Sequence, residues 1–121
     1  MDPQKPDPNS PPMDYQSALE RVGMDREFLA ELIALYQSEF PKFFGRMKTA
    51  FDCSDFSTVS KLAHSLKGSS ANLGFPGLGD ISKELEAAGN NSDRQRIEKN
   101  LDVLKMEYQR VKTYLMDIKV S

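Results

Sequence analysis

The sequence predicts an all-α protein, an antiparallel up-down four-helix bundle preceded by one or two short helices. From residue 14 onward, apolar residues recur at three- and four-residue spacing, as on the buried face of a helix, and no stretch of useful length alternates as a strand would. The breaks between the helical segments, at residues 53–55, 74–76 and 89–93, are short. Short connections favour antiparallel neighbours.

The composition limits the class of protein. At 121 residues with a net charge of −2 at pH 7, the chain is most simply one domain. The slightly acidic balance argues against nucleic acid or an anionic membrane as the main partner, because both require a basic face. No apolar run approaches the roughly 20 residues needed to span a bilayer, and the single cysteine, Cys53, is typical of a reducing compartment. We therefore expect a soluble, cytoplasmic protein.

The first twelve residues differ from the rest. They hold five of the seven prolines among polar and charged residues, with almost nothing apolar to bury. We expect residues 1–12 to form a flexible tail and residues 13–120 to form the helical domain. A proline-rich recognition peptide is the less favoured interpretation, because such proline spacing is common in plain linkers.

Two helical segments follow the tail. Asp14 is placed to cap a short helix over residues 15–22, which Gly23 ends, and Asp25 to cap a longer second helix. Pro41 is expected to kink that helix or to restart it over residues 42–51, because proline lacks a backbone donor. The apolar residues of this segment, mostly assigned to the core, are Phe28, Leu29, Leu32, Ile33, Tyr36, Phe40, Phe43, Phe44, Met47 and Phe51.

The central helix is expected to begin at a cap formed by Ser54 or Asp55. It runs to Leu73 and ends at Gly74, where the following Phe-Pro pair enforces a turn. Small residues at Ser69 and Ser70 border its core side and are interpreted as packing residues.

The fourth helix opens at Pro76 and is expected to end at Gly89. Ser92 and Gln95 then fit a capping box for the last helix. That helix carries a narrow apolar seam whose steps alternate between four and three: Ile97, Leu101, Leu104, Tyr108, Val111, Leu115 and Ile118. The seam could support dimerisation, but burial inside the bundle is the more economical use, so we expect a monomer.

The only histidine, His64, lies in the central helix, two residues from both Leu62 and Leu66. At about 100° per residue this places it nearly opposite the apolar stripe, so the imidazole faces solvent. The residues predicted to share that side are Ser57, Ser60, Lys61, Lys67, Gly68 and Ala71.

The neighbours of His64 suit a nucleophilic imidazole. A neutral ring has one free nitrogen nucleophile, and Lys67, one turn on, could balance the charge of a phosphoryl group bound there. Glycine inside a helix costs roughly 0.8–1.0 kcal/mol relative to alanine, so Gly68 requires a reason. It could open access for an incoming domain, or it could allow close helix packing.

Other site chemistries are less favoured by the sequence. One histidine and one distant cysteine do not make a metal ligand set, so no metal is expected. A Ser–His pair is disfavoured because Ser65 is adjacent in sequence to His64 and points elsewhere, and no carboxylate is placed by sequence to orient the ring.

Residues 63–70, Ala-His-Ser-Leu-Lys-Gly-Ser-Ser, followed by Asn72-Leu73-Gly74, resemble the histidine-containing phosphotransfer (HPt) domain of multistep two-component phosphorelays. The family pattern, His-x-x-Lys-Gly followed by small residues, is present without a departure. Residues 78–86 are similar to the helix that follows in the family. The resemblance extends over about residues 14–118.

The resemblance implies that His64 is the phosphoryl acceptor and donor, Lys67 its charge partner, and Gly68 the clearance for a receiver domain's aspartate pocket. It implies a carrier rather than an enzyme, with response-regulator receiver domains and a hybrid sensor histidine kinase as partners. In the family the Mg²⁺ belongs to the receiver, so no cofactor is expected on this chain. Lys61 and Ala71 flank the His64 face and are candidate partner contacts.

Two alternatives remain at this point. One is a helical scaffold or docking module for a signalling kinase or receiver, in which the histidine is incidental. The other is a hydrolytic or transferase enzyme with His64 as general base, which would require a substrate pocket that a filled bundle core does not obviously supply. No Gly-rich phosphate loop is present, so autonomous kinase activity is not expected.

Overall fold

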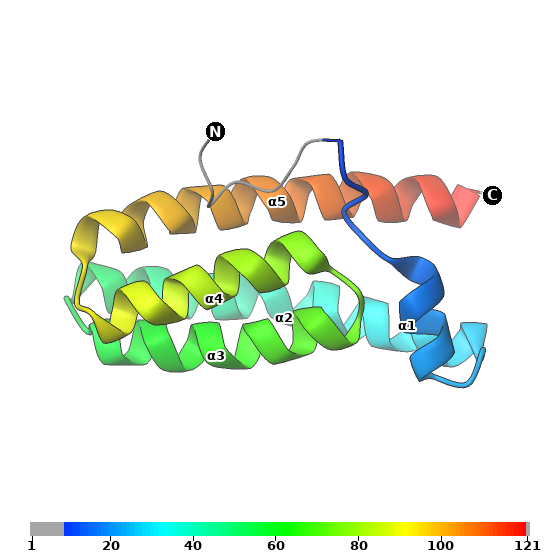
Figure 1. Cartoon of the computed structure of the whole chain (residues 1–121), viewed down its shortest axis with the longest axis horizontal. Coiled ribbons are helices and arrows are strands. Elements are labelled where there is room, and N and C mark those ends of the chain that lie inside the picture. Colours follow the sequence, from blue (N-terminus) through cyan, green and yellow to red (C-terminus); the bar gives the residue numbers. More distant parts are fainter. Residues whose placement is uncertain (1–8, 121) are drawn as a thin grey trace.

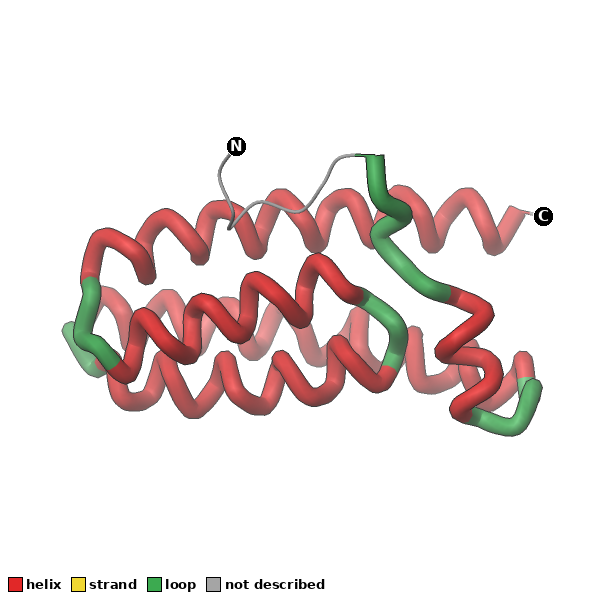
Figure 2. The backbone as a smooth tube through the Cα atoms, viewed as in Figure 1, coloured by secondary structure: helices red, strands yellow, loops and turns green. Residues whose placement is uncertain are grey.

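The computed structural model describes residues 9–120, with side chains through residue 118. This part of the chain forms five helices, whose arrangement is shown in Figures 1 and 2. Their bounds are α1 Tyr15–Arg21, α2 Arg26–Asp52, α3 Phe56–Asn72, α4 Pro76–Asn90 and α5 Arg94–Val120. The four long helices run side by side, while α1 lies across one end, beside the turn that joins α3 to α4 (Figure 1). The predicted all-α bundle with a short first helix is confirmed.

The bundle closes as a ring in which each long helix packs on its chain neighbour and α5 returns to α2. The apolar seam predicted for α5 lies inside this ring: its first six members are buried and Ile118 is partly buried. Phe43 and Phe44 of α2 are only partly buried, at the edge of the core. The seam is therefore used within the bundle.

Pro41 does not restart α2, which is one continuous helix through this position. A proline has no N–H to donate to the carbonyl four residues earlier, which here is that of Gln37. That oxygen instead accepts a hydrogen bond of 3.2 Å from the hydroxyl of Tyr108 on α5. Tyr108 also stacks on Phe40, with ring centroids 3.8 Å apart. A tertiary contact replaces the missing helix bond.

The helix ends follow the predicted caps in part. Asp14 and Asp25 cap α1 and α2 as predicted, and of the two candidates for α3 it is Asp55 that accepts from the backbone of Thr58. The capping box at Ser92 is wrong. Ser92 lies in the turn with φ +52°, and Asp93 accepts from the backbone N–H at residue 96 instead.

The turn after α3 needs its glycine. Gly74 has φ +71°, and a Cβ there would meet the backbone carbonyl of Asp14 at 2.6 Å. The carbonyl of Gly74 accepts from the N–H of Asp14, and Arg21 donates to the carbonyls of Ala71 and Asn72 at 2.8 and 3.1 Å. The first helix therefore closes the end of α3.

The flexible tail predicted at residues 1–12 lies mostly outside the described residues. Near its described end, the carbonyl of Ser10 accepts a hydrogen bond of 2.7 Å from the Arg110 guanidinium. Within residues 9–120, no helix is both long and apolar enough to cross a membrane.

A buried carboxylate on α5 packs against the start of α4. Glu107 is almost inaccessible and forms an ion pair of 3.1 Å with Arg110. A Cβ on Gly77, in the first turn of α4, would collide with its carboxyl group. Burial raises the pKa of Glu107 above its ordinary value of 4.5, and the charge of Arg110 offsets this in part.

Replacing Glu107 by glutamine tests this burial. Because the pKa is raised in the folded state, the folded protein binds more protons, and stability is lost as pH rises from 4.5 through the raised pKa. Glu107→Gln lacks this loss, so its stability relative to wild type should improve in urea unfolding as pH rises from 4.5 through the raised pKa. The exposed Glu98→Gln should show no such trend. A Glu107→Gln variant whose stability relative to wild type falls as pH rises would contradict the raised pKa of Glu107.

Candidate functional site

His64 lies on the solvent side of α3, as predicted, with 66% of its side chain exposed. On the opposite side of the helix, Val59, Ala63 and Leu66 are buried in the core. Apolar packing therefore fixes the helix and leaves the imidazole free to meet another molecule.

A carboxylate from the neighbouring helix orients the ring. Oε2 of Glu86 on α4 is 2.7 Å from Nδ1 of His64, and Oε1 is 2.8 Å from Nζ of Lys67. The hydrogen bond from Lys67, with a further one from His64, holds the pKa of Glu86 below its ordinary value of 4.5. Glu86 is thus ionised at neutral pH and can only accept hydrogen bonds.

The ionised carboxylate sets the chemistry of the imidazole. Because Glu86 accepts, Nδ1 carries the proton, and in the neutral ring Nε2 is left with the lone pair. With most of the side chain exposed, that nitrogen is available to an electrophile brought by a partner. The arrangement of carboxylate, imidazole and open nucleophile is suited to group transfer through Nε2.

Lys67 lies beside the same carboxylate, with 36% of its side chain exposed. Its ammonium is a compact charge on a flexible stem. It can therefore stay near Glu86 while the ring is unmodified and turn toward a dianionic group on the ring when one is present.

Ser60 does not belong to the exposed face on which the sequence placed it. It is buried at 7% exposure under α4. Its hydroxyl lies 2.7 Å from Oδ1 of Asn90 and 3.2 Å from the backbone carbonyl of Glu86. The reason is that α4 packs closer to the His64 side of α3 than a helical wheel alone can show.

The remaining predicted site residues are exposed. Gly68, Lys61 and Ala71 all lie on the solvent side of α3. A Cβ on Gly68 would meet nothing within 4 Å, so the interpretation that this glycine allows close helix packing is wrong. The small residues after it divide: Ser70 is buried and bonds to the Tyr36 hydroxyl at 2.7 Å, while Ser69 is exposed and not a core residue.

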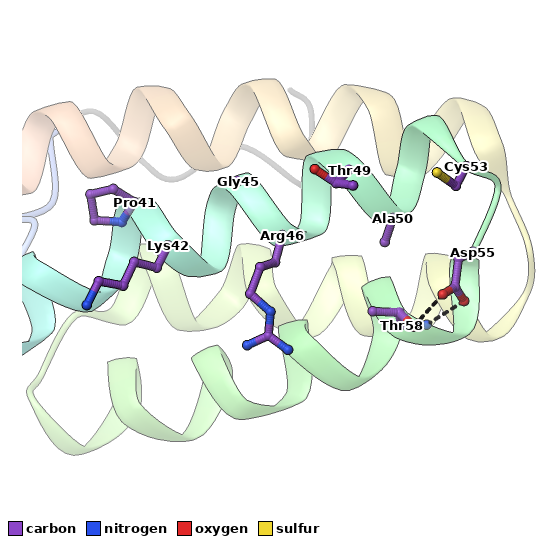
Figure 3. Close-up of a pocket in the computed structure, with 9 residues that line it drawn as sticks. All are labelled: Pro41, Lys42, Gly45, Arg46, Thr49, Ala50, Cys53, Asp55 and Thr58. Atoms are coloured by element: carbon purple, nitrogen blue, oxygen red, sulfur yellow. Dashed lines mark hydrogen bonds between the residues drawn. The ribbon is translucent and has the colours of Figure 1, made fainter.

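Two concavities lie between α2 and α3. An apolar groove of about 340 Å³ borders Ser65, directly after His64, and is walled by Leu35 and Phe43 of α2. Further along the same helix pair, a more open one of about 730 Å³ is lined by Lys42 and Arg46, with Arg46 directed from α2 toward α3 (Figure 3). In the part of the chain described, no three His, Cys, Asp or Glu side chains gather as a metal site.

Glu86 is the site residue that sequence reasoning missed, having found no carboxylate placed to orient the ring. The signal available was its position directly after Leu85 on the apolar face of α4, which puts it at the margin of a buried face. Choosing Glu86 over the other acidic residues of α4, Asp80 and Glu84, requires the rotation and depth of that helix against α3.

Comparison with known proteins gives one family. The model of the Hpt domain matches residues 31–114, which is more than half of the chain and contains the whole site. The match leaves out α1, the first turn of α2 and the last six residues of α5. No curated protein matches the chain.

The Glu86–Lys67 contact makes a testable prediction about pH. Lys67→Met removes the largest cause of the lowered pKa, so the carboxyl of Glu86 should titrate closer to 4.5 in ¹³C NMR than in wild type. In wild type, the contact with His64 should persist below pH 4.5 and be lost as pH falls through the lowered pKa. Lys61→Met, also exposed on α3, is the matched control. An unchanged titration of Glu86 in Lys67→Met would overturn the assignment.

Proposed function

Because the chain belongs to the Hpt domain family, whose members carry phosphoryl groups on histidine in phosphorelays, we propose that it is a phosphorelay intermediate. His64 accepts the phosphoryl group from the aspartate of one receiver domain and passes it to the aspartate of another. The observation that carries this proposal is the exposed imidazole of His64, whose Nδ1 is held by Glu86.

The forward step follows from this geometry. The Nε2 lone pair attacks phosphorus, the bond from phosphorus to the aspartyl oxygen breaks, and the carboxylate leaves with its electron pair. The ring then carries the phosphoryl group at Nε2 and a proton at Nδ1, and is positively charged. Glu86, 2.7 Å from Nδ1, stabilises that charge, and Lys67 offsets the charge of the phosphoryl oxygens.

The same groups support the return step. When a second receiver's aspartate attacks phosphorus, the ring is the leaving group, and a ring that keeps its Nδ1 proton leaves as neutral imidazole. Because Glu86 accepts that hydrogen bond in both states, the ring needs no reorientation between acceptance and donation. The chain acts as a carrier without autonomous kinase activity, and Mg²⁺ is supplied by the receiver.

The docking face proposed for the receiver is the exposed side of α3 around His64. Gly68 leaves open space one turn beyond the imidazole, and the apolar groove beside Ser65 offers a surface that a partner's apolar side chains can cover. Lys61 and Ala71 flank this face. The partners are receiver domains of response regulators and of a hybrid sensor histidine kinase, met by a cytoplasmic monomer that binds neither nucleic acid nor membrane.

The first test is transfer of labelled phosphate from a phosphorylated receiver domain. We expect acid-labile, alkali-stable label on wild type, which is the signature of phosphohistidine, and none on His64→Gln. Glu84→Gln, two residues before Glu86 on α4 and paired with Arg96 at 3.1 Å, should be labelled normally. Equal labelling of His64→Gln would refute the proposal. Receiver binding that survives in His64→Gln, with no label on wild type from receivers, phosphoramidate or acetyl phosphate, would favour the scaffold function.

Gly68 supplies a second test, of the docking face. Since a Cβ at this position meets nothing within 4 Å, and glycine weakens a helix interior, Gly68→Gln should keep the fold with a melting temperature equal to or above that of wild type. Its side chain would stand between the imidazole and the receiver, so we expect transfer from the receiver to slow about 10-fold or more, with a smaller effect in Gly68→Ala. Phosphorylation by acetyl phosphate, which needs no docking, should change little. Equal transfer rates in all three proteins would remove the clearance role.

A further inference from the structure

α3 and α4 approach one another closely at Gly89. A Cβ on this residue would lie 2.9 Å from the backbone carbonyl oxygen of Phe56, 2.9 Å from the Cβ of Ser60 and 3.0 Å from its backbone nitrogen. Two of these three atoms are backbone, which cannot rotate away. Any side chain at residue 89 therefore requires the two helices to move apart.

Gly89 does not end α4, as the sequence had suggested. The helix continues to Asn90, with Asn91 as its C-cap, and Gly89 is not among the positive-φ glycines. Its backbone conformation is one that any residue adopts, so what the fold needs from it is the missing Cβ. This separates Gly89 from Gly74, which the turn requires for its φ.

The comparison with Gly79 shows that only one end of α4 requires, against α3, a residue without a Cβ. Gly79, near the start of α4, also faces α3, but a Cβ there would meet only the Cβ of Ser70 at 4.0 Å, an ordinary van der Waals distance. The helices are thus tightly spaced at the Gly89 end of α4, which is the end that carries Glu86, and not at the other.

The tight contact and the functional carboxylate share one turn of helix. Glu86 is three residues before Gly89, and the Ser60 hydroxyl that packs beside Gly89 lies 3.2 Å from the Glu86 carbonyl and 2.7 Å from Oδ1 of Asn90. The carboxyl group of Glu86 spans to α3 with contacts of 2.7 and 2.8 Å. N–H···O hydrogen bonds in proteins span about 2.7–3.2 Å, so an outward movement of α4 would stretch both contacts beyond this range.

We propose that Gly89 and Ser60 are positioning residues: their contact sets the distance between α3 and α4 at which the Glu86 carboxylate reaches His64 and Lys67. They touch no reacting atom and act through Glu86. The effect on phosphotransfer rests on the proposed function, whereas the effect on the Glu86 contact does not.

The experiment compares the same substitution at two places on one helix face. Gly89→Ala should remain folded by circular dichroism but move α4 outward. In ¹³C NMR the pKa of the Glu86 carboxyl should then rise toward 4.5, and the ¹⁵N signals of His64 should show loss of the single Nδ1–H tautomer. Transfer from a phosphorylated receiver should fall about 10-fold. Gly79→Ala should match wild type in all three measurements.

Ser60→Ala gives a second reading that does not introduce a clash. It keeps the Cβ and removes only the hydroxyl, so α4 loses its polar tie to α3 and Glu86 should show a smaller pKa change in the same direction. If Gly89→Ala does not fold, the test rests on Ser60→Ala. A Glu86 pKa in Ser60→Ala equal to that of wild type would then overturn the proposal. Gly89→Ala that behaves as Gly79→Ala also overturns it.

The two proposals fail in different ways. If wild type accepts no label from any donor, the proposed phosphotransfer is wrong, yet the Glu86 titration and the His64 tautomer still report whether Gly89 sets the spacing. If wild type is labelled and Gly89→Ala keeps both the Glu86 pKa and the transfer rate, only the positioning role is refuted.

Discussion

The Glu86 carboxylate between α3 and α4 is the interaction on which the candidate site depends. It fixes the proton on Nδ1 of His64, leaves Nε2 as the nucleophile, and holds the Lys67 ammonium within 2.8 Å. Glu86 lies three residues before Gly89, where α4 approaches α3 so closely that a Cβ would clash with the backbone of Phe56 and Ser60. The chemistry at the surface is thus set by helix spacing beneath it.

The bundle also has to present a nucleophile without losing the helix that carries it. The buried face of α3, with Val59, Ala63 and Leu66 at 2% exposure or less, anchors the helix, while α1 and the Gly74 turn close its end. Burial of apolar surface supplies most of the stability of such a helix. The exposed side of α3 can therefore carry residues that leave His64 accessible, including Gly68, which weakens the helix.

The sequence determined the fold class, the order of the long helices and the candidate nucleophile. These follow from local or periodic signals: apolar spacing, caps at Asp14 and Asp25, and the His64–Gly68 spacing. Two of the misses, at Pro41 and Ser60, have a tertiary cause. Pro41 lies within a continuous α2 because Tyr108 on α5 bonds the carbonyl left without a donor, and Ser60 is buried because α4 covers it.

Only the tertiary structure decided which carboxylate serves His64 and what Gly89 is for. Helical periodicity gives the direction of a side chain around its own axis but not the rotation, depth or spacing of the neighbouring helix. Glu86 and His64 are 22 residues apart, and their contact depends on where α4 packs. The sequence alone therefore identifies the candidate phosphoryl acceptor, and the packing of two helices determines which of its nitrogens is left without a proton.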